Sequence, residues 1–260
     1  MSIKFTLLGC GSSMGVPRID GFFGKCNPKN KKNYRTRCSA LISSKKKNIL
    51  IDTSPDLRTQ LLKSKIKIIN RVLYSHKHAD QTHGINDLRI FYLKNKKKIP
   101  VYANLSTSKY LKKTFSYCFK DNPTRPKSLN YPAILKIKKL EKNLTFSDLT
   151  IKSIPLNHGN IDSMSFIINN KCAYASDAKK IYQKDIRLFK NLKFLIIDCL
   201  RYDSHPSHFN LNEIIKLVKI LKPNKTILTN LHTDMDYKIL KKKLPKNIVP
   251  AYDGMSILIK

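Results

Sequence analysis

The sequence contains seven histidines, and each follows a short apolar run of the kind that forms a β-strand. The densest group lies in Ser75-His-Lys-His-Ala-Asp-Gln-Thr-His-Gly84. His76 and His78 are one residue apart, so a loop could aim both imidazoles at one cation, while Asp80 could face a second cation beside it. Imidazole and carboxylate ligands suit zinc, manganese or iron. Alone, the His-x-His pair would also fit two ordinary loop histidines.

Three residues far along the chain strengthen the metal interpretation. His158, Asp177 and His232 each lie at or just beyond the end of a later apolar run. Because the carboxyl ends of neighbouring strands meet at one edge of a sheet, these side chains are expected to converge with the first group. The sequence therefore predicts a metal centre at that edge.

The elements that would position these residues alternate along the chain, as expected for layered α/β structure. Strands are predicted over Ile3–Leu8, Ala40–Ser44, Ile49–Asp52, Arg71–Ser75, Pro100–Ala103, Leu149–Pro155, Cys172–Ser176, Phe194–Cys199 and Thr226–Asn230. One helix is expected to begin after Ser54-Pro55-Asp56, and Asn210 with Glu213 predicts a capping box for another. Further helices are predicted over residues 84–95, 107–119 and 236–244.

Several motifs together resemble the metallo-β-lactamase superfamily. The His-x-His-x-Asp segment is followed by a lone His, an Asp after a strand and a late His. The segments LGCGSSMGVPR, RTRCSALI, ILIDTSPDLR, HADQTHGINDLR, SHPSHFNL, TNLH and AYDGM resemble one branch of the superfamily. That branch contains phosphoribosyl cyclic phosphate phosphodiesterase, and ribonuclease Z is a more distant relative. The resemblance implies a four-layered αββα sandwich, with residues 1–260 forming a single domain.

The resemblance also implies two divalent ions, zinc or manganese, with defined ligands. The first ion would be held by His76, His78 and His158, Asp177 would bridge both ions, and Asp80 and His232 would hold the second. The superfamily motif places a histidine where this chain has Gln81. A neutral amide oxygen is a poorer zinc ligand than imidazole, so the second site is expected to be weaker or to prefer a harder ion.

The chemistry implied is metal-assisted hydrolysis. Two cations lower the pKa of a water between them and neutralise phosphoryl oxygens, and Asp80 is expected to orient the attacking hydroxide. His208, in Ser204-His-Pro-Ser-His208, resembles the residue of a loop in which relatives supply a catalytic histidine. It is predicted to contact the substrate and to protonate the leaving group. The alternative is a loop histidine that stabilises its own turn.

The formal charge of +34 invites a nucleic-acid interpretation. However, 42 lysines against 9 arginines, together with many Ile and Asn, are also what an AT-rich genome would produce. The lysines occur along the whole chain rather than in one segment. Either way, the positive field favours an anionic substrate, with nucleic acid the less favoured partner.

The expected compartment is the cytoplasm. The N-terminus lacks the apolar stretch of a signal peptide, and no run approaches the roughly 18 apolar residues that span a membrane. The six cysteines are scattered without a Cys-x-x-Cys pair and are expected to be reduced thiols. No membrane partner is expected, and the resemblance adds a homodimer as an expectation.

The leading functional prediction is a metal-dependent hydrolase of a small cyclic or nucleotide-like phosphodiester. One alternative is an RNA-processing nuclease resembling ribonuclease Z, which grips tRNA with a long arm. No insertion here has the length and Gly/Pro content of that arm, and residues 120–133 are expected to form a short lid. A thioester or lactam hydrolase is a further alternative. The least favoured is a catalytically silent, nucleic-acid-binding scaffold, which Gln81 could indicate.

Overall fold

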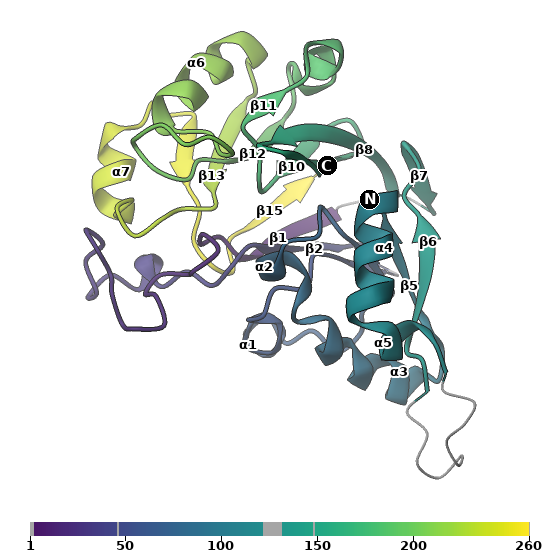
Figure 1. Cartoon of the computed structure of the whole chain (residues 1–260). Helices are drawn as coiled ribbons and strands as arrows, with labels where there is room; N and C mark the ends of the chain where they lie inside the picture. Colours follow the sequence, from purple (N-terminus) through teal and green to yellow (C-terminus); the bar gives the residue numbers. More distant parts are fainter. Residues whose placement is uncertain (1–2, 46, 122–131, 148, 260) are drawn as a thin grey trace.

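Two β-sheets lie face to face, and helices cover the outer face of each (Figure 1). A computed structural model describes residues 3–45, 47–121, 132–147 and 149–259. The predicted four-layered αββα architecture is confirmed. Most of the expected lid, residues 122–131, lies outside the described residues.

The first sheet is built mainly from the N-terminal half of the chain. Its strand order is β15-β1-β2-β3-β4-β5-β6. The strands are β1 (Ile3–Gly9), β2 (Ser39–Ser43), β3 (Asn48–Ile51), β4 (Arg71–Leu73), β5 (Ile99–Ala103), β6 (Leu135–Lys139) and β15 (Ser256–Ile259). From β3 to β6 the strands are parallel, so their carboxyl ends meet at one edge.

The second sheet contains the later strands in the order β11-β8-β9-β10-β12-β13-β14, with β7 paired to β8. The strands are β7 (Asn143–Phe146), β8 (Leu149–His158), β9 (Ile161–Ile168), β10 (Cys172–Ala175), β11 (Lys180–Ile181), β12 (Phe194–Asp198), β13 (Lys225–Thr229) and β14 (Ile248–Pro250). The strands β10, β12, β13 and β14 run parallel. Their carboxyl ends form the second half of the edge at which the predicted site residues lie.

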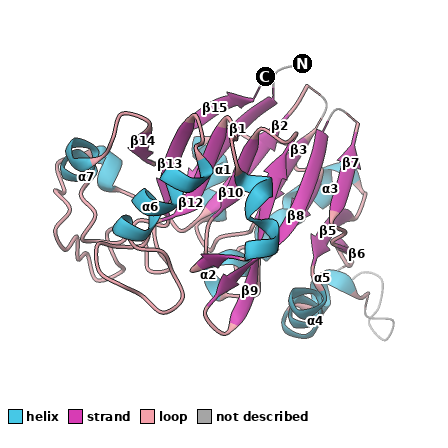
Figure 2. Cartoon of the chain, turned by 90° about the horizontal axis from the view of Figure 1, so that it is seen from above, coloured by secondary structure: helices cyan, strands magenta, loops and turns pink. Residues whose placement is uncertain are grey.

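Three apolar clusters hold the layers together. Between the sheets, Phe5, Phe166 and Tyr174 are buried with branched aliphatic side chains from both sheets. The first sheet is covered by α1 (Leu57–Lys63), α3 (Arg89–Asn95), α4 (Leu105–Thr114) and α5 (Ser116–Phe119). The second is covered by α6 (Leu211–Leu221) and α7 (Tyr237–Lys243). Figure 2 shows the same arrangement from above. Burial of these faces is the main favourable contribution to folding.

Every predicted strand has a counterpart in the structure, with ends that differ by a few residues. The predicted capping box is confirmed, since the Asn210 side chain accepts from Glu213 N and the Glu213 carboxylate accepts from Asn210 N. The helix predicted after Ser54-Pro55-Asp56 is α1, although the Asp56 side chain makes no capping bond. Among the described residues, no helix has both the length and the apolar character needed to cross a bilayer.

Candidate metal centre and catalytic site

The loop after β4 carries the first group of predicted ligands, and a buried carboxylate fixes its start. Asp52 accepts a hydrogen bond from Ser75 N through Oδ1 at 2.7 Å and is fully buried. The loop then enters the short helix α2 (Ala79–Thr82). At its far end Gly84 lies against the carbonyl of Ser54, where any Cβ would collide. The chain therefore holds the ligand loop against the segment that follows β3.

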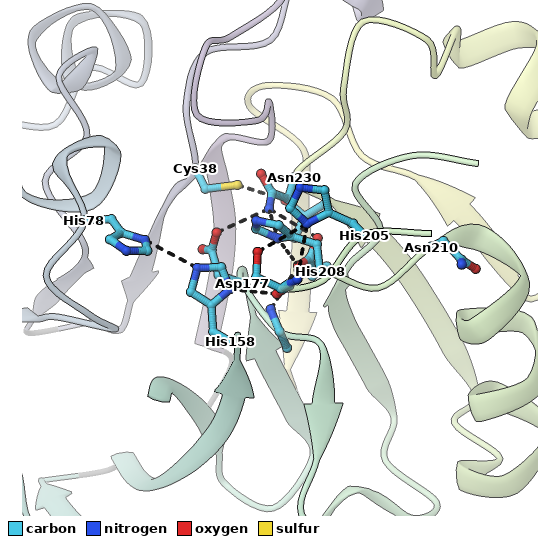
Figure 3. Close-up of polar contacts among 12 residues, drawn as sticks. Cys38, His78, His158, Asp177, His205, His208, Asn210 and Asn230 are labelled. Carbon is cyan, nitrogen blue, oxygen red and sulfur yellow. Dashed lines mark hydrogen bonds and ion pairs between the residues drawn. The ribbon is translucent and has the colours of Figure 1, made fainter. Parts of the chain in front are cut away.

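The imidazoles of His76 and His78 meet that of His158, which ends β8. Figure 3 shows His78 and His158 facing each other. His76 Nε2 lies 2.9 Å from His78 Nδ1, and His158 Nε2 lies 3.4 Å from the same His78 atom. His158 Nδ1 is 2.8 Å from the carbonyl oxygen of Ser207, which can only accept. Nδ1 therefore carries the proton, and the lone pair of Nε2 points at the other two rings.

The environment keeps these rings neutral, which a metal ligand requires. Burial lowers the pKa of His76 well below its usual value, and the neighbouring rings of His158 and His78 lower it further. Burial also lowers the pKa of His158, to about 4, and that of His78. Three inward-facing imidazoles this close together fit a divalent cation.

A second potential ligand group shares His158 with the first. One ligand atom each from His158, Asp177 and His208 lies within 4.8 Å of the others. Asp177 follows β10 and is buried, and both burial and the charge of Asp80 raise its pKa. A cation would relieve both penalties at Asp177, so His158 and Asp177 also fit a metal ion, whereas His208 is bonded to the carboxylate of Asp198.

Asp80 and His232 lie on the wall of the same pocket but outside both compact groups. Asp80 lies in the first turn of α2. His232 follows β13, and its Nδ1 is 3.1 Å from Oδ1 of Asp234. A carboxylate that bonds one ring nitrogen orients the other, as in many metal sites. Both residues remain predicted ligands of the second ion.

Gln81, where the superfamily motif has histidine, is fully buried between two carboxylates. Its amide nitrogen donates to Oδ2 of Asp80 at 3.1 Å and to Oδ2 of Asp177 at 3.2 Å. Its amide oxygen is buried and has no hydrogen-bond partner. In this arrangement Gln81 ties two predicted ligands together through its nitrogen and does not offer its oxygen.

His208 faces the predicted ligands from the loop between β12 and α6 (Figure 3). Its Nδ1 lies 2.6 Å from Oδ2 of the fully buried Asp198, and its ring centroid lies 4.7 Å from that of His158. Burial alone would lower the pKa of His208, but the adjacent carboxylate of Asp198 raises it to about 9. The ring is therefore protonated at neutral pH and can donate a proton.

Sequence reasoning missed two residues that position His208. Asp198 ends β12, and Asn230 follows β13 with its amide nitrogen 3.2 Å from Asp198 Oδ1 and 3.3 Å from Asp177 Oδ1. Both follow a buried apolar run, which is the same signal that identified Asp177. Asp198 could have been found by that rule.

These groups surround a pocket of about 340 Å³. Its wall is formed by Ser12, Ser13, Met14, His78, Asp80, His158, Asp177, Leu200, Arg201, His205, Ser207, His208, Asn230 and His232. The pocket therefore contains all the predicted site residues except the deeply buried His76.

The chain is similar in sequence and fold to known proteins of one superfamily. The pattern of the Beta-lactamase superfamily domain matches residues 47–230. The crystal structure described as a new diphosphatase from the PhnP family superposes with a TM-score of 0.89 at 28% identity, covering 100% of this chain and 98% of that one. The short form of human tRNase Z has a TM-score of 0.70 at 17% identity over 98% of each chain, which supports the fold alone.

A curated relative is also similar over nearly the whole chain. It is a Porphyromonas gingivalis protein named Octanoyltransferase, 31% identical over 265 residues. The match covers 99% of this chain but 52% of the relative, so the chain spans about half the length of that protein.

Proposed function

Because the chain belongs to the β-lactamase superfamily and has the metallo-β-lactamase fold of its hydrolase members, we propose that it hydrolyses a small phosphodiester with the help of divalent metal ions. The observation that carries the proposal is the placement of His208. This ring is hydrogen-bonded to a buried carboxylate and lies beside the cluster of His76, His78 and His158.

We assign one set of residues to binding metal ions and another residue to donating a proton. His76, His78, His158 and Asp177 would hold the first cation, and Asp177, Asp80 and His232 the second. When bound, such ions polarise the phosphoryl group and lower the pKa of an attacking water. Asp80, which lines the pocket, would orient that water by accepting a hydrogen bond from it.

His208 would supply the proton that the leaving oxygen needs. Asp198 holds Nδ1, so the opposite nitrogen of the imidazolium is the one that can donate. Asn230 donates to the carboxylates of Asp198 and Asp177, which keeps both acids oriented. The shared lining of one pocket by His208 and most of the predicted metal ligands supports this division of roles.

The size of the pocket and its similarity to a PhnP-family diphosphatase favour a small substrate. About 340 Å³ holds a phosphodiester with one sugar-sized substituent. The name Octanoyltransferase belongs to a relative twice as long, and acyl transfer is not proposed here. The six cysteines are all buried, so none offers an accessible nucleophile for acyl chemistry.

The proposal is tested by hydrolysis of bis-p-nitrophenyl phosphate by metal-stripped protein to which manganese or zinc is returned. Release of p-nitrophenolate that needs the added ion, and that disappears in Asp80→Ala, is the expected result. Absence of activity with every divalent ion would favour the silent scaffold instead.

A further inference from the structure

A buried arginine outside the pocket contacts the chain segment that carries His232. Arg35 is 2% exposed, and none of the ion pairs found among the described residues includes it. Its guanidinium instead donates to two backbone carbonyls, from Nη2 to that of Met235 at 2.7 Å and from Nη1 to that of His232 at 3.4 Å. Burying a charge is costly, and bonds to oxygen atoms of this kind offset the cost here.

The two carbonyls belong to the ends of one turn. Met235 N donates to the carbonyl of His232 at 3.1 Å, so residues 232–235 turn back on themselves just after β13. The donors of a guanidinium form a planar fork, which lets a single arginine bond both ends of the turn. Arg35 therefore holds the shape of this turn.

The groups that orient the His232 ring belong to the same turn. His232 N donates to the carbonyl of Leu200 at 3.0 Å, and the ring Nδ1 lies 3.1 Å from Oδ1 of Asp234. The position of the ring and that of its carboxylate partner thus both depend on the turn. His232 lines the pocket, whereas Arg35 does not, so Arg35 can affect this predicted ligand only through the turn.

Arg35 is itself fixed by its surroundings. Its backbone N–H donates to the carbonyl of Val16 at 2.8 Å, and Val16 N donates back to the carbonyl of Arg35 at 2.9 Å. Asn33 Oδ1 accepts from Arg35 Nη2 at 3.1 Å and from Tyr237 N at 2.8 Å. Asn33 Nδ2 donates at 2.6 Å to Asp236, whose side chain caps the start of α7. The guanidinium therefore has a set position from which to hold the turn.

From these contacts we infer that Arg35 is a positioning residue for the predicted second metal site. It holds the turn at residues 232–235 so that the His232 ring is oriented before an ion binds, and a ligand oriented in advance binds more tightly. The inference rests on the proposed function, because it takes His232 as a ligand of the second ion. A residue that only supported the fold would affect both metal sites alike.

The test is a zinc titration of the whole metal-free protein in competition with a chromophoric chelator, which resolves the affinities of the first and second equivalents. Arg35→Gln is expected to weaken the second equivalent by about tenfold or more and to leave the first within about twofold. Arg35→Lys should restore only part of the loss, because an ammonium lacks the planar fork. Urea unfolding of the metal-free proteins records any loss of stability separately.

Arg71→Gln is the matched control. Arg71 begins β4, at the opposite end of that strand from the ligand loop, and its guanidinium lies 4.5 Å from the centroid of the Phe146 ring. This variant should lower the stability and keep both zinc affinities. If Arg35→Gln does not fold, Asn33→Ala, which removes one acceptor of the Arg35 guanidinium, should still weaken the second equivalent selectively.

Equal weakening of both equivalents in folded Arg35→Gln, or an unchanged second equivalent, would overturn the inference. A wild type that binds only one zinc ion at saturation would overturn it as well. Failure of the proposed function is a separate result, because it is measured as missing hydrolysis of bis-p-nitrophenyl phosphate. A protein that shows the selective loss but no hydrolysis would keep the role of Arg35 and lose the proposed reaction.

Discussion

The amide nitrogen of Gln81 lies 3.2 Å from Oδ2 of Asp177, and the same atom lies 3.1 Å from Oδ2 of Asp80. The two carboxylates come from different sheets, so this side chain links the two halves of the site. Gln81 stands where the superfamily motif has an imidazole ligand. An amide nitrogen has no lone pair to offer a cation, so the proposed second ion would have one ligand fewer.

Gln81→His should therefore strengthen the second metal site. An added imidazole is expected to raise the affinity for the second equivalent of zinc by about tenfold or more. Metal content is measured by plasma mass spectrometry after dialysis at defined free zinc. Gln183→His, at an exposed position, is the matched control and should leave the content unchanged. If the wild type bound two zinc ions with equal affinity, Gln81 would not weaken the second metal site.

Single substitutions should affect metal binding and proton donation independently. His158→Ala and Asp177→Ala remove predicted ligands of the first ion and should therefore lose bound metal. His208→Ala should keep its metal and lose about 10²-fold or more in kcat, the usual contribution of a general acid. Metal content and kcat are measured on the same preparations. Turnover of His208→Ala at the parental rate would remove this residue from the mechanism.

Asp198 is expected to act through His208 rather than on the substrate. Asp198→Asn removes the charge that favours the imidazolium, so a substrate with an alkoxide leaving group should slow by about 10²-fold. A p-nitrophenyl ester should slow much less, because its leaving group needs little protonation. The kcat of the two ester types is compared in wild type and variant. Equal losses for both would indicate that Asp198 only supports the fold.

Much of the site was predictable because most of its residues share one position in the sequence, directly at or after the end of a strand. His76, His158, Asp177 and His232 lie at or just after strand ends, and apolar runs reveal strand ends without a structure. The position of Asp198 obeys the same rule, but its role depends on a 2.6 Å contact with a loop residue ten positions later. Loop geometry of that kind leaves no periodic pattern in a sequence.

The fold was predictable to a similar extent. Nine strands were predicted and found, whereas the short strands β6, β7, β11, β14 and β15 were not predicted. The longer strand β9 was missed as well, because Asp162, Ser163 and Ser165 interrupt its apolar pattern. Pairing with β8 over its full length makes this segment a strand, and pairing is a long-range effect. The orientation of the Gln81 side-chain amide could not be predicted either. Whether its nitrogen or its oxygen faces the carboxylates depends on how the surrounding residues pack.

An ion pair outside the site should make stability depend on pH. Arg37 Nη2 lies 2.6 Å from Oδ1 of Asp56, and Arg37 Nε lies 2.8 Å from Oδ2. Burial raises the pKa of Asp56, but the hydrogen bonds from Arg37 outweigh it and leave the pKa below the usual 3.8. Because the folded-state pKa is depressed, the pair stabilises the protein above pH 3.8 and loses this effect as the pH falls through the lower, folded-state value.

Asp56→Asn should therefore lower the free energy of unfolding at pH 7 by about 1 kcal/mol, a value limited by solvent screening of this partly exposed pair. The difference in the free energy of unfolding between variant and wild type should shrink below pH 3.8. Urea denaturation at pH 7 and at a pH below 3.8 measures this difference. Glu141→Gln, in a more exposed pair with Lys139, is the control and should change little. A difference that grew on acidification would contradict the sign.

We propose that His76, His78, His158 and Asp177, with Asp80 and His232, hold divalent ions beside His208. Anomalous scattering from crystals grown with manganese would locate these ions. A peak is predicted within bonding distance of His76, His78 and His158, with a second and weaker peak toward Asp80 and His232. If folded protein saturated with manganese gave no peak among these side chains, the proposed metal centre would be wrong.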